Sequence, residues 1–215
     1  MFFCKLMVSL VKVMDLESHR PALIMAGLVC LLIVIVAMIA SVWPNQEEWF
    51  FELGLLGKDK IADEYFVDVH SVVDVGEVNS WFIYVHNHMG DVEAVSIRVK
   101  LLNSTMDLPE DQKLQPTQTE SFAEVPLSLS VNEIVFVPFT WSILEAENQD
   151  DSTVIKRLMV NEKPVEVDVS ISTNSSSWMV FELWVQDHNS GEYTFGWESN
   201  KGVFFASVYI GFRVI

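Results

Sequence analysis

Two histidines separated by one residue, His86 and His88, are the part of this sequence best suited to chemistry. Side chains at positions i and i+2 of a β-strand share a face, so both imidazoles could reach one ion. Copper and zinc accept imidazole ligands, and Asp91 is close enough along the chain to add a carboxylate oxygen. The sequence therefore offers a copper or zinc site, and plain polar surface beside a turn is the alternative.

The remaining sequence predicts no catalytic residue. It contains no nucleophile paired with a base, no phosphate-binding glycine loop and no His-Glu-x-x-His motif. The two cysteines are Cys4 and Cys30, so residues 44–215 offer no thiolate to a metal or a substrate. Two acidic stretches, residues 107–111 and 148–152, match a calcium loop only in part. We expect no enzyme and no cofactor, and weak calcium binding is an open alternative.

Two Asn-x-Ser/Thr sequons begin at Asn103 and Asn174. Both lie between predicted strands, in stretches with the composition of loops. If this part of the chain lies outside a membrane, both asparagines are candidates for N-glycosylation, and chance matches are the alternative.

Residues 22–40 form an uncharged apolar run without proline. As a helix rising about 1.5 Å per residue it would measure roughly 28 Å, close to the ~30 Å core of a bilayer. Basic residues precede the run and acidic residues follow it, which orients the N-terminus inward. We predict an amphipathic cytoplasmic head over residues 1–20, a transmembrane helix over 21–43 and an extracellular domain over 44–215. Cleavage after the run, as in a signal peptide, is the alternative.

The charge of the chain narrows the choice of partners. It has 30 acidic and 13 basic residues, a net charge of −17 at neutral pH. A surface this acidic repels nucleic acid and anionic lipid. We therefore expect partners among membrane or envelope proteins, with the lipid bilayer contacted through residues 22–40.

Alternation of apolar and polar residues predicts strands through most of residues 44–215. One buried and one wet face is typical of antiparallel sheets. The predicted fold is mainly β, an antiparallel immunoglobulin-like β-sandwich. Exceptions are a short helix over residues 151–161 and two loops, over 104–120 and 144–153. The strands are expected near residues 49–56, 65–73, 78–87, 92–103, 121–131, 133–142, 164–172, 178–186, 192–197 and 203–214.

Short motifs in this domain resemble an archaeal membrane-protein family of unestablished activity, which joins transmembrane helices to a sandwich akin to the cell-adhesion-related (CARDB) domain. The chain departs from that family in having one predicted span and Phe66 where relatives have proline. The resemblance implies the sandwich fold and no activity. The matching positions are Glu52, Leu55, Leu56, Gly57, Gly76, Glu77, Asn87, His88, Phe181, Leu183 and Trp184.

Aromatic residues on both faces of single strands indicate a protein interface, and a large core filled by bulky inward side chains is the alternative. The candidates are Trp81, Phe82, Tyr84, Phe205 and Tyr209. Our leading hypothesis is a non-enzymatic, single-pass envelope protein whose sandwich binds other proteins, as an accessory subunit of a membrane complex. A copper- or zinc-binding subunit of a membrane metalloenzyme and a surface adhesion module are the alternatives.

Overall fold

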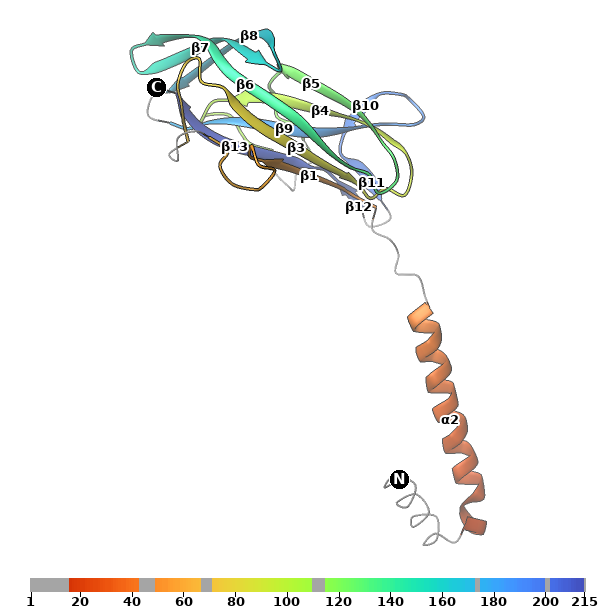
Figure 1. Ribbon diagram of the computed structural model, residues 1–215. Coiled ribbons are helices and arrows are strands. Elements are labelled where there is room, and N and C mark those ends of the chain that lie inside the picture. The colour runs from red at the N-terminus through yellow and green to blue at the C-terminus, as the bar shows by residue number, and fades with distance from the viewer. Residues whose placement is uncertain are drawn as a thin grey trace. The chain divides into compact units, whose positions relative to one another are not determined.

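The computed structural model describes residues 16–42, 49–66, 71–109, 115–172, 175–199 and 202–214 (Figure 1). The chain divides into two compact units, Met1–Glu47 and Glu48–Ile215. The first contains the helix α2 (Leu16–Val42), and the second contains the strands β1 to β13. Each unit is described by itself below.

Helix α2 includes Pro21 in its first turns and exposes the apolar side chains of residues 24–38. A crossing needs about 20 consecutive apolar residues in one helix. In the described part of the chain, no helix is long and apolar enough to cross a membrane. The transmembrane helix predicted over residues 21–43 is therefore not supported. Most of the predicted amphipathic head lies outside the described residues.

The second unit is a sandwich of two sheets, as the alternation predicted. One sheet has the order β1-β3-β6-β7-β8 and is antiparallel throughout. Its strands are β1 (Phe51–Leu56), β3 (Asn79–Asn87), β6 (Ile134–Gln149), β7 (Ser152–Val160) and β8 (Lys163–Ser172).

The other sheet has the order β2-β13-β9-β4-β5, and β10 pairs with β9 beside that path. A parallel pair, β13 with β2, interrupts its antiparallel pattern. Strands β11 (Trp197–Ser199) and β12 (Gly202–Phe204) form a separate hairpin. The strands of this sheet are β2 (Val72–Val73), β4 (Glu93–Leu102), β5 (Ala123–Leu129), β9 (Ser177–Gln186), β10 (Tyr193–Phe195) and β13 (Ser207–Val214).

The core between the sheets is rich in aromatic rings. Trp81 of β3 lies at its centre and is 1% exposed. Its ring is within 6.3 Å, centroid to centroid, of the rings of Phe139 and Phe181, and it lies 5.3 Å from Trp141. Its indole N–H donates to the carbonyl of Tyr65, so the polar edge of the ring has a partner in the core.

Two predicted elements around β7 are wrong, and of the strand predicted over residues 65–73 the described residues keep only β2. The helix predicted over residues 151–161 is β7, and the acidic loop predicted over 144–153 is the end of β6 and its turn into β7. The pairing of β7 with β8 shifts register between Ile155 and Arg157, and the pairing of β6 with β7 shifts near Glu145. A bulge adds one residue to a strand. The alternation of apolar and polar residues is therefore interrupted within β6 and β7, and the sequence does not show the pattern of a strand there.

Candidate functional site

The outward residues of β3 form a row between two neighbouring strands. Phe82, Tyr84 and His86 alternate with the buried Trp81, Ile83 and Val85. On one side β1 places Glu52 opposite His86, and on the other side β6 places Ile134 opposite the same residue. The pairing therefore brings side chains from three strands to one outer face of the sandwich.

Four side chains of this face form a polar group that we call the Glu52 cluster: Glu52, Tyr84, His86 and His88. The Tyr84 hydroxyl donates to Glu52 Oε2 at 2.7 Å and lies 3.3 Å from His86 Nδ1. His86 Nδ1 lies 3.4 Å from Glu52 Oε2, and His88 Nε2 lies 3.5 Å from Glu52 Oε1. The carboxylate therefore has one oxygen near each of the two imidazoles that the sequence predicted to share a face.

The hydrogen bond from Tyr84 shapes the electrostatics of the cluster. It is the main cause that lowers the pKa of Glu52, and the two histidines lower that pKa further. The same hydrogen bond raises the pKa of Tyr84, because losing the proton would leave two anions in contact. Glu52 is thus held as a carboxylate, the form that accepts a proton or binds a cation.

His88 is fixed in position by Phe50. The two rings stack with centroids 4.2 Å apart and planes inclined by 16°, and the backbone N–H of His88 donates to the carbonyl of Phe50 at 2.9 Å. The His86 and His88 rings are 3.6 Å apart, centroid to centroid. His88 Nε2 is nonetheless a buried nitrogen without a hydrogen-bond partner. Such an atom marks an incomplete polar site.

Asp91, the third predicted metal ligand, does not join the cluster. Its carboxylate accepts the backbone N–H of Val92 at 2.7 Å, and its carbonyl accepts the Asn87 amide at 2.8 Å. Asp91 is therefore an exposed turn residue. Among the described residues, the group of three metal-ligating side chains is Glu52, His86 and His88, whose ligand atoms lie within 4.8 Å of one another. Sequence reasoning missed Glu52 as a member of this group, and only the register of β1 against β3 could have indicated it.

Apolar side chains continue the same face toward the middle of the sheet. We call this surface the docking face: Phe82, Tyr84, Ile134, Phe136 and Pro138. Tyr84 and Phe136 lie opposite each other with ring centroids 5.5 Å apart, and Phe82 lies opposite Pro138. Ile134 is 48% exposed and Phe136 is 39% exposed. The Lys60 ammonium lies over the rings of Phe82 and Phe136, 4.9 Å and 5.0 Å from their centroids.

The five predicted interface residues do not form one surface. Trp81 is buried in the core, so its predicted role at an interface is wrong. Phe82 and Tyr84 belong to the docking face. Tyr209 is exposed on the other sheet, where it contacts Trp178 edge-on, and Phe205 contacts Phe195.

The structure adds little support for glycosylation at the two sequons or for calcium binding at the two acidic stretches. Asn103 uses its side-chain oxygen to accept the backbone N–H and the hydroxyl of Thr105. Asn174 lies outside the described residues. Residues 148–152 form the β6–β7 turn, where the Asn148 oxygen accepts the Thr153 hydroxyl at 3.0 Å. That oxygen is engaged within the hairpin, which does not suit a calcium loop. Part of the stretch 107–111 is also outside the described residues.

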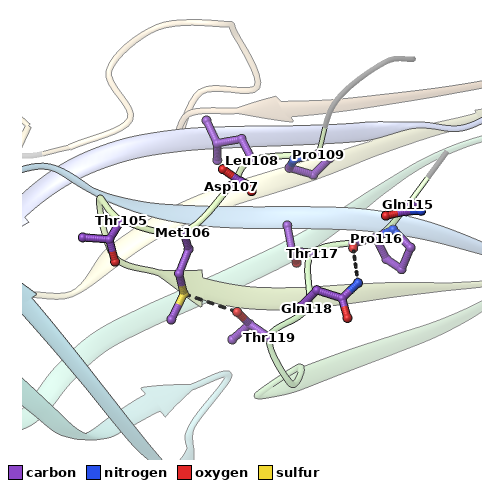
Figure 2. Close-up of a pocket in the computed structure, with 10 residues that line it drawn as sticks. All are labelled: Thr105, Met106, Asp107, Leu108, Pro109, Gln115, Pro116, Thr117, Gln118 and Thr119. Carbon is purple, nitrogen blue, oxygen red and sulfur yellow. Dashed lines mark hydrogen bonds between the residues drawn. The ribbon is translucent and has the colours of Figure 1, made fainter. Parts of the chain in front are cut away.

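A cavity of about 390 Å³ lies between residues 105–109 and 115–119 (Figure 2). Figure 2 shows the Thr119 hydroxyl donating to the Met106 sulfur and the Gln118 amide donating to the Pro116 carbonyl. Asp107 is the one ionisable side chain among the described residues of its lining. The described part of the lining therefore offers one carboxylate and no second ionisable side chain beside it.

Comparisons with known proteins find solved structures of low similarity. The CARDB domain of a Pyrococcus furiosus protein, in complex with di-metal ions, is similar with a TM-score of 0.37 and 11% identity, over 79% of this chain and 90% of that chain. A Listeria innocua β-glucosidase in complex with gluconolactone has a TM-score of 0.31 and 14% identity, over 78% of this chain and 17% of that enzyme. No family model and no curated protein matches the sequence. At these TM-scores and identities no family is assigned to the chain.

Proposed function

We propose that this β-sandwich is a non-enzymatic binding module whose docking face contacts a partner protein. The observation that carries the proposal is the exposure of Ile134 and Phe136 beside Phe82 and Tyr84 on the outer face of an antiparallel sheet. Outer faces of such sheets are normally polar. An apolar centre with aromatic rings is typical of the part of an interface that contributes most to affinity.

The chemistry of the partner follows from charge. The chain carries a net charge of −17, and Lys60 is the basic side chain that the structure places against the rings of the docking face. An acidic surface speeds and orients the approach of a basic one. The proposed partner therefore presents an apolar centre surrounded by lysine and arginine. A membrane or envelope protein, with this chain as its accessory subunit, remains our proposal for its identity.

Site-specific photocrosslinking in living cells of the native host tests the proposal. A photoreactive benzoyl-phenylalanine at position 136 should give one discrete crosslinked product with another protein. The matched control places the same residue at Tyr209, an aromatic position of similar exposure on the other sheet. No product at position 136, equal products at both positions, or a product between two copies of this chain would each overturn the proposed partner.

Two further measurements test the apolar contact and the charge of the partner. The Phe136→Asp variant should lose the product formed from a crosslinker at position 82, whereas Tyr209→Asp should retain it. The yield should also fall as the salt concentration of a cell extract rises, because a basic rim is screened. A yield that does not depend on salt would contradict the proposed charge of the partner.

A further inference from the structure

We propose that Glu52, His86 and His88 bind one divalent transition-metal ion on the outer face of the β1–β3 pair. This inference stands apart from the proposed function, since it concerns an ion and not a partner protein. It uses two nitrogen donors and one carboxylate, held on adjacent antiparallel strands.

The spacing of the donor atoms fits a small coordination sphere. Ligands at about 2.0–2.1 Å from zinc in a tetrahedral site are roughly 3.3 Å from one another. The distance from His86 Nδ1 to Glu52 Oε2 is 3.4 Å, and that from His88 Nε2 to Glu52 Oε1 is 3.5 Å. Each imidazole nitrogen therefore lies about as far from its nearer carboxylate oxygen as two ligands of one ion lie from each other. One donor atom from each of the three residues also lies within 4.8 Å of the other two.

The unsatisfied nitrogen is an independent observation. His88 Nε2 is buried and makes no hydrogen bond, although it lies near the Glu52 carboxylate. Stacking on Phe50 fixes the plane of the His88 ring, so the nitrogen cannot turn freely to water. A buried imidazole nitrogen that lies 3.5 Å from a carboxylate oxygen and makes no hydrogen bond is a position that a cation would complete.

Tyr84 and Phe50 support the ligands without binding the ion. The Tyr84 hydroxyl donates to Glu52 Oε2 and so fixes the orientation of the carboxylate. Hydrogen bonds of this kind commonly govern the affinity of a metal site. Gly54 lies opposite Tyr84, and a Cβ at that glycine would be 3.5 Å from the Tyr84 ring. The Tyr84 ring therefore covers Gly54 so closely that an added Cβ would be in van der Waals contact with it.

The donor set selects the class of metal. Imidazole nitrogen favours zinc, copper and nickel, whereas calcium and magnesium prefer sites made of oxygen alone. Three protein ligands leave at least one coordination position for water or another group, as in zinc sites that are not closed. We expect zinc and copper to bind, and calcium not to compete.

The alternative is that the cluster is only a hydrogen-bonded tie between β1 and β3. Binding of zinc chloride to the metal-free full-length chain, made without a polyhistidine tag, distinguishes the two by isothermal titration calorimetry. Wild-type protein should bind one zinc ion per chain, and an excess of calcium should not reduce the binding. X-ray absorption of the zinc complex should show two imidazole ligands.

Single substitutions assign the site. His88→Ala and the isosteric Glu52→Gln should each lower zinc affinity at least tenfold, with the near-ultraviolet circular dichroism of the aromatic core unchanged. His188→Ala is the matched control, because His188 pairs with Glu93 elsewhere in the domain at 3.3 Å. The zinc affinity of the His188→Ala variant should equal that of the wild-type protein. No saturable binding, unaltered binding in Glu52→Gln, or an equal loss in His188→Ala would overturn the metal site and leave the docking proposal unaffected.

Discussion

The ion pair between Lys100 and Glu182 gives the sharpest prediction about stability. Lys100 Nζ lies 2.8 Å from Glu182 Oε2, and the two side chains are 5% and 0% exposed. Glu182 also accepts the backbone N–H of Thr117 at 2.7 Å and its hydroxyl at 2.9 Å, and the Trp184 indole at 3.2 Å. Lys100 in turn donates to the Thr117 carbonyl at 2.8 Å. The pair thus holds the segment around Thr117 against the outer face of the second sheet.

Glu182→Gln should destabilise the sandwich strongly. The substitution keeps the shape of the side chain but leaves the Lys100 ammonium buried beside an uncharged amide. Removing one partner of a buried ion pair costs about 3–5 kcal/mol. At about 2–4 °C per kcal/mol for a domain of this size, the melting temperature should fall by roughly 6–20 °C.

Urea denaturation followed by tryptophan fluorescence measures this change. The pair of the half-buried Arg98 and the exposed Glu124 is the control, and Glu124→Gln should cost less than about 1 kcal/mol. The Lys100→Met/Glu182→Gln double variant should recover about 2 kcal/mol of the summed single losses, because no buried charge is then unpaired. A loss below about 1 kcal/mol for Glu182→Gln, or strict additivity in the double variant, would refute the reasoning.

Two further predictions concern loops. Gly57→Ala should disorder the segment that carries Lys60, since its Cβ would lie 2.0 Å from the Asp63 carbonyl oxygen, and hydrogen exchange of residues 57–64 should rise at least tenfold. Unchanged exchange would contradict this. The pKa of Asp187 is lowered, first by the hydrogen bond from the backbone N–H of Ser190. The ionised Asp187 side chain therefore stabilises the folded domain fully above the unfolded pKa of about 3.9, and this stabilisation is lost as the pH falls through the lower folded pKa. Asp187→Asn should therefore lower the melting temperature at neutral pH but not near pH 2, and an equal difference at both pH values would contradict the assignment.

Local alternation was enough to predict most of the sandwich. It works for β3 and β8, because every second residue of each strand faces the core. It failed for β7, where Val154, Ile155 and Leu158 are all buried around a register shift. Their spacing of one and three residues imitates one face of a helix. A bulge is defined by the partner strand, so a single sequence gives little indication of it.

In the candidate site, too, features within one strand could be predicted from the sequence, whereas the pairing between strands could not. The shared face of His86 and His88 follows from their spacing alone. Asp91 was chosen because it is near in sequence, but a tight turn uses its carboxylate. Glu52 lies far away along the chain and reaches the histidines through one β1–β3 register. Alternation along one strand contains no information about which residue of another strand lies opposite.

The two proposals share one outer face because the same strand pairing builds both surfaces. The β3 residue Tyr84 donates to Glu52 with its hydroxyl and contacts Phe136 with its ring. Tyr84→Phe separates these roles, because it keeps the ring and removes the hydrogen bond. The variant should bind zinc more weakly, since the carboxylate loses its orienting donor, and should still give the crosslinked product from position 136. Loss of both properties would mean that the docking face depends on the Glu52 cluster, and the partner would then be recognised through the polar group as well as the apolar one.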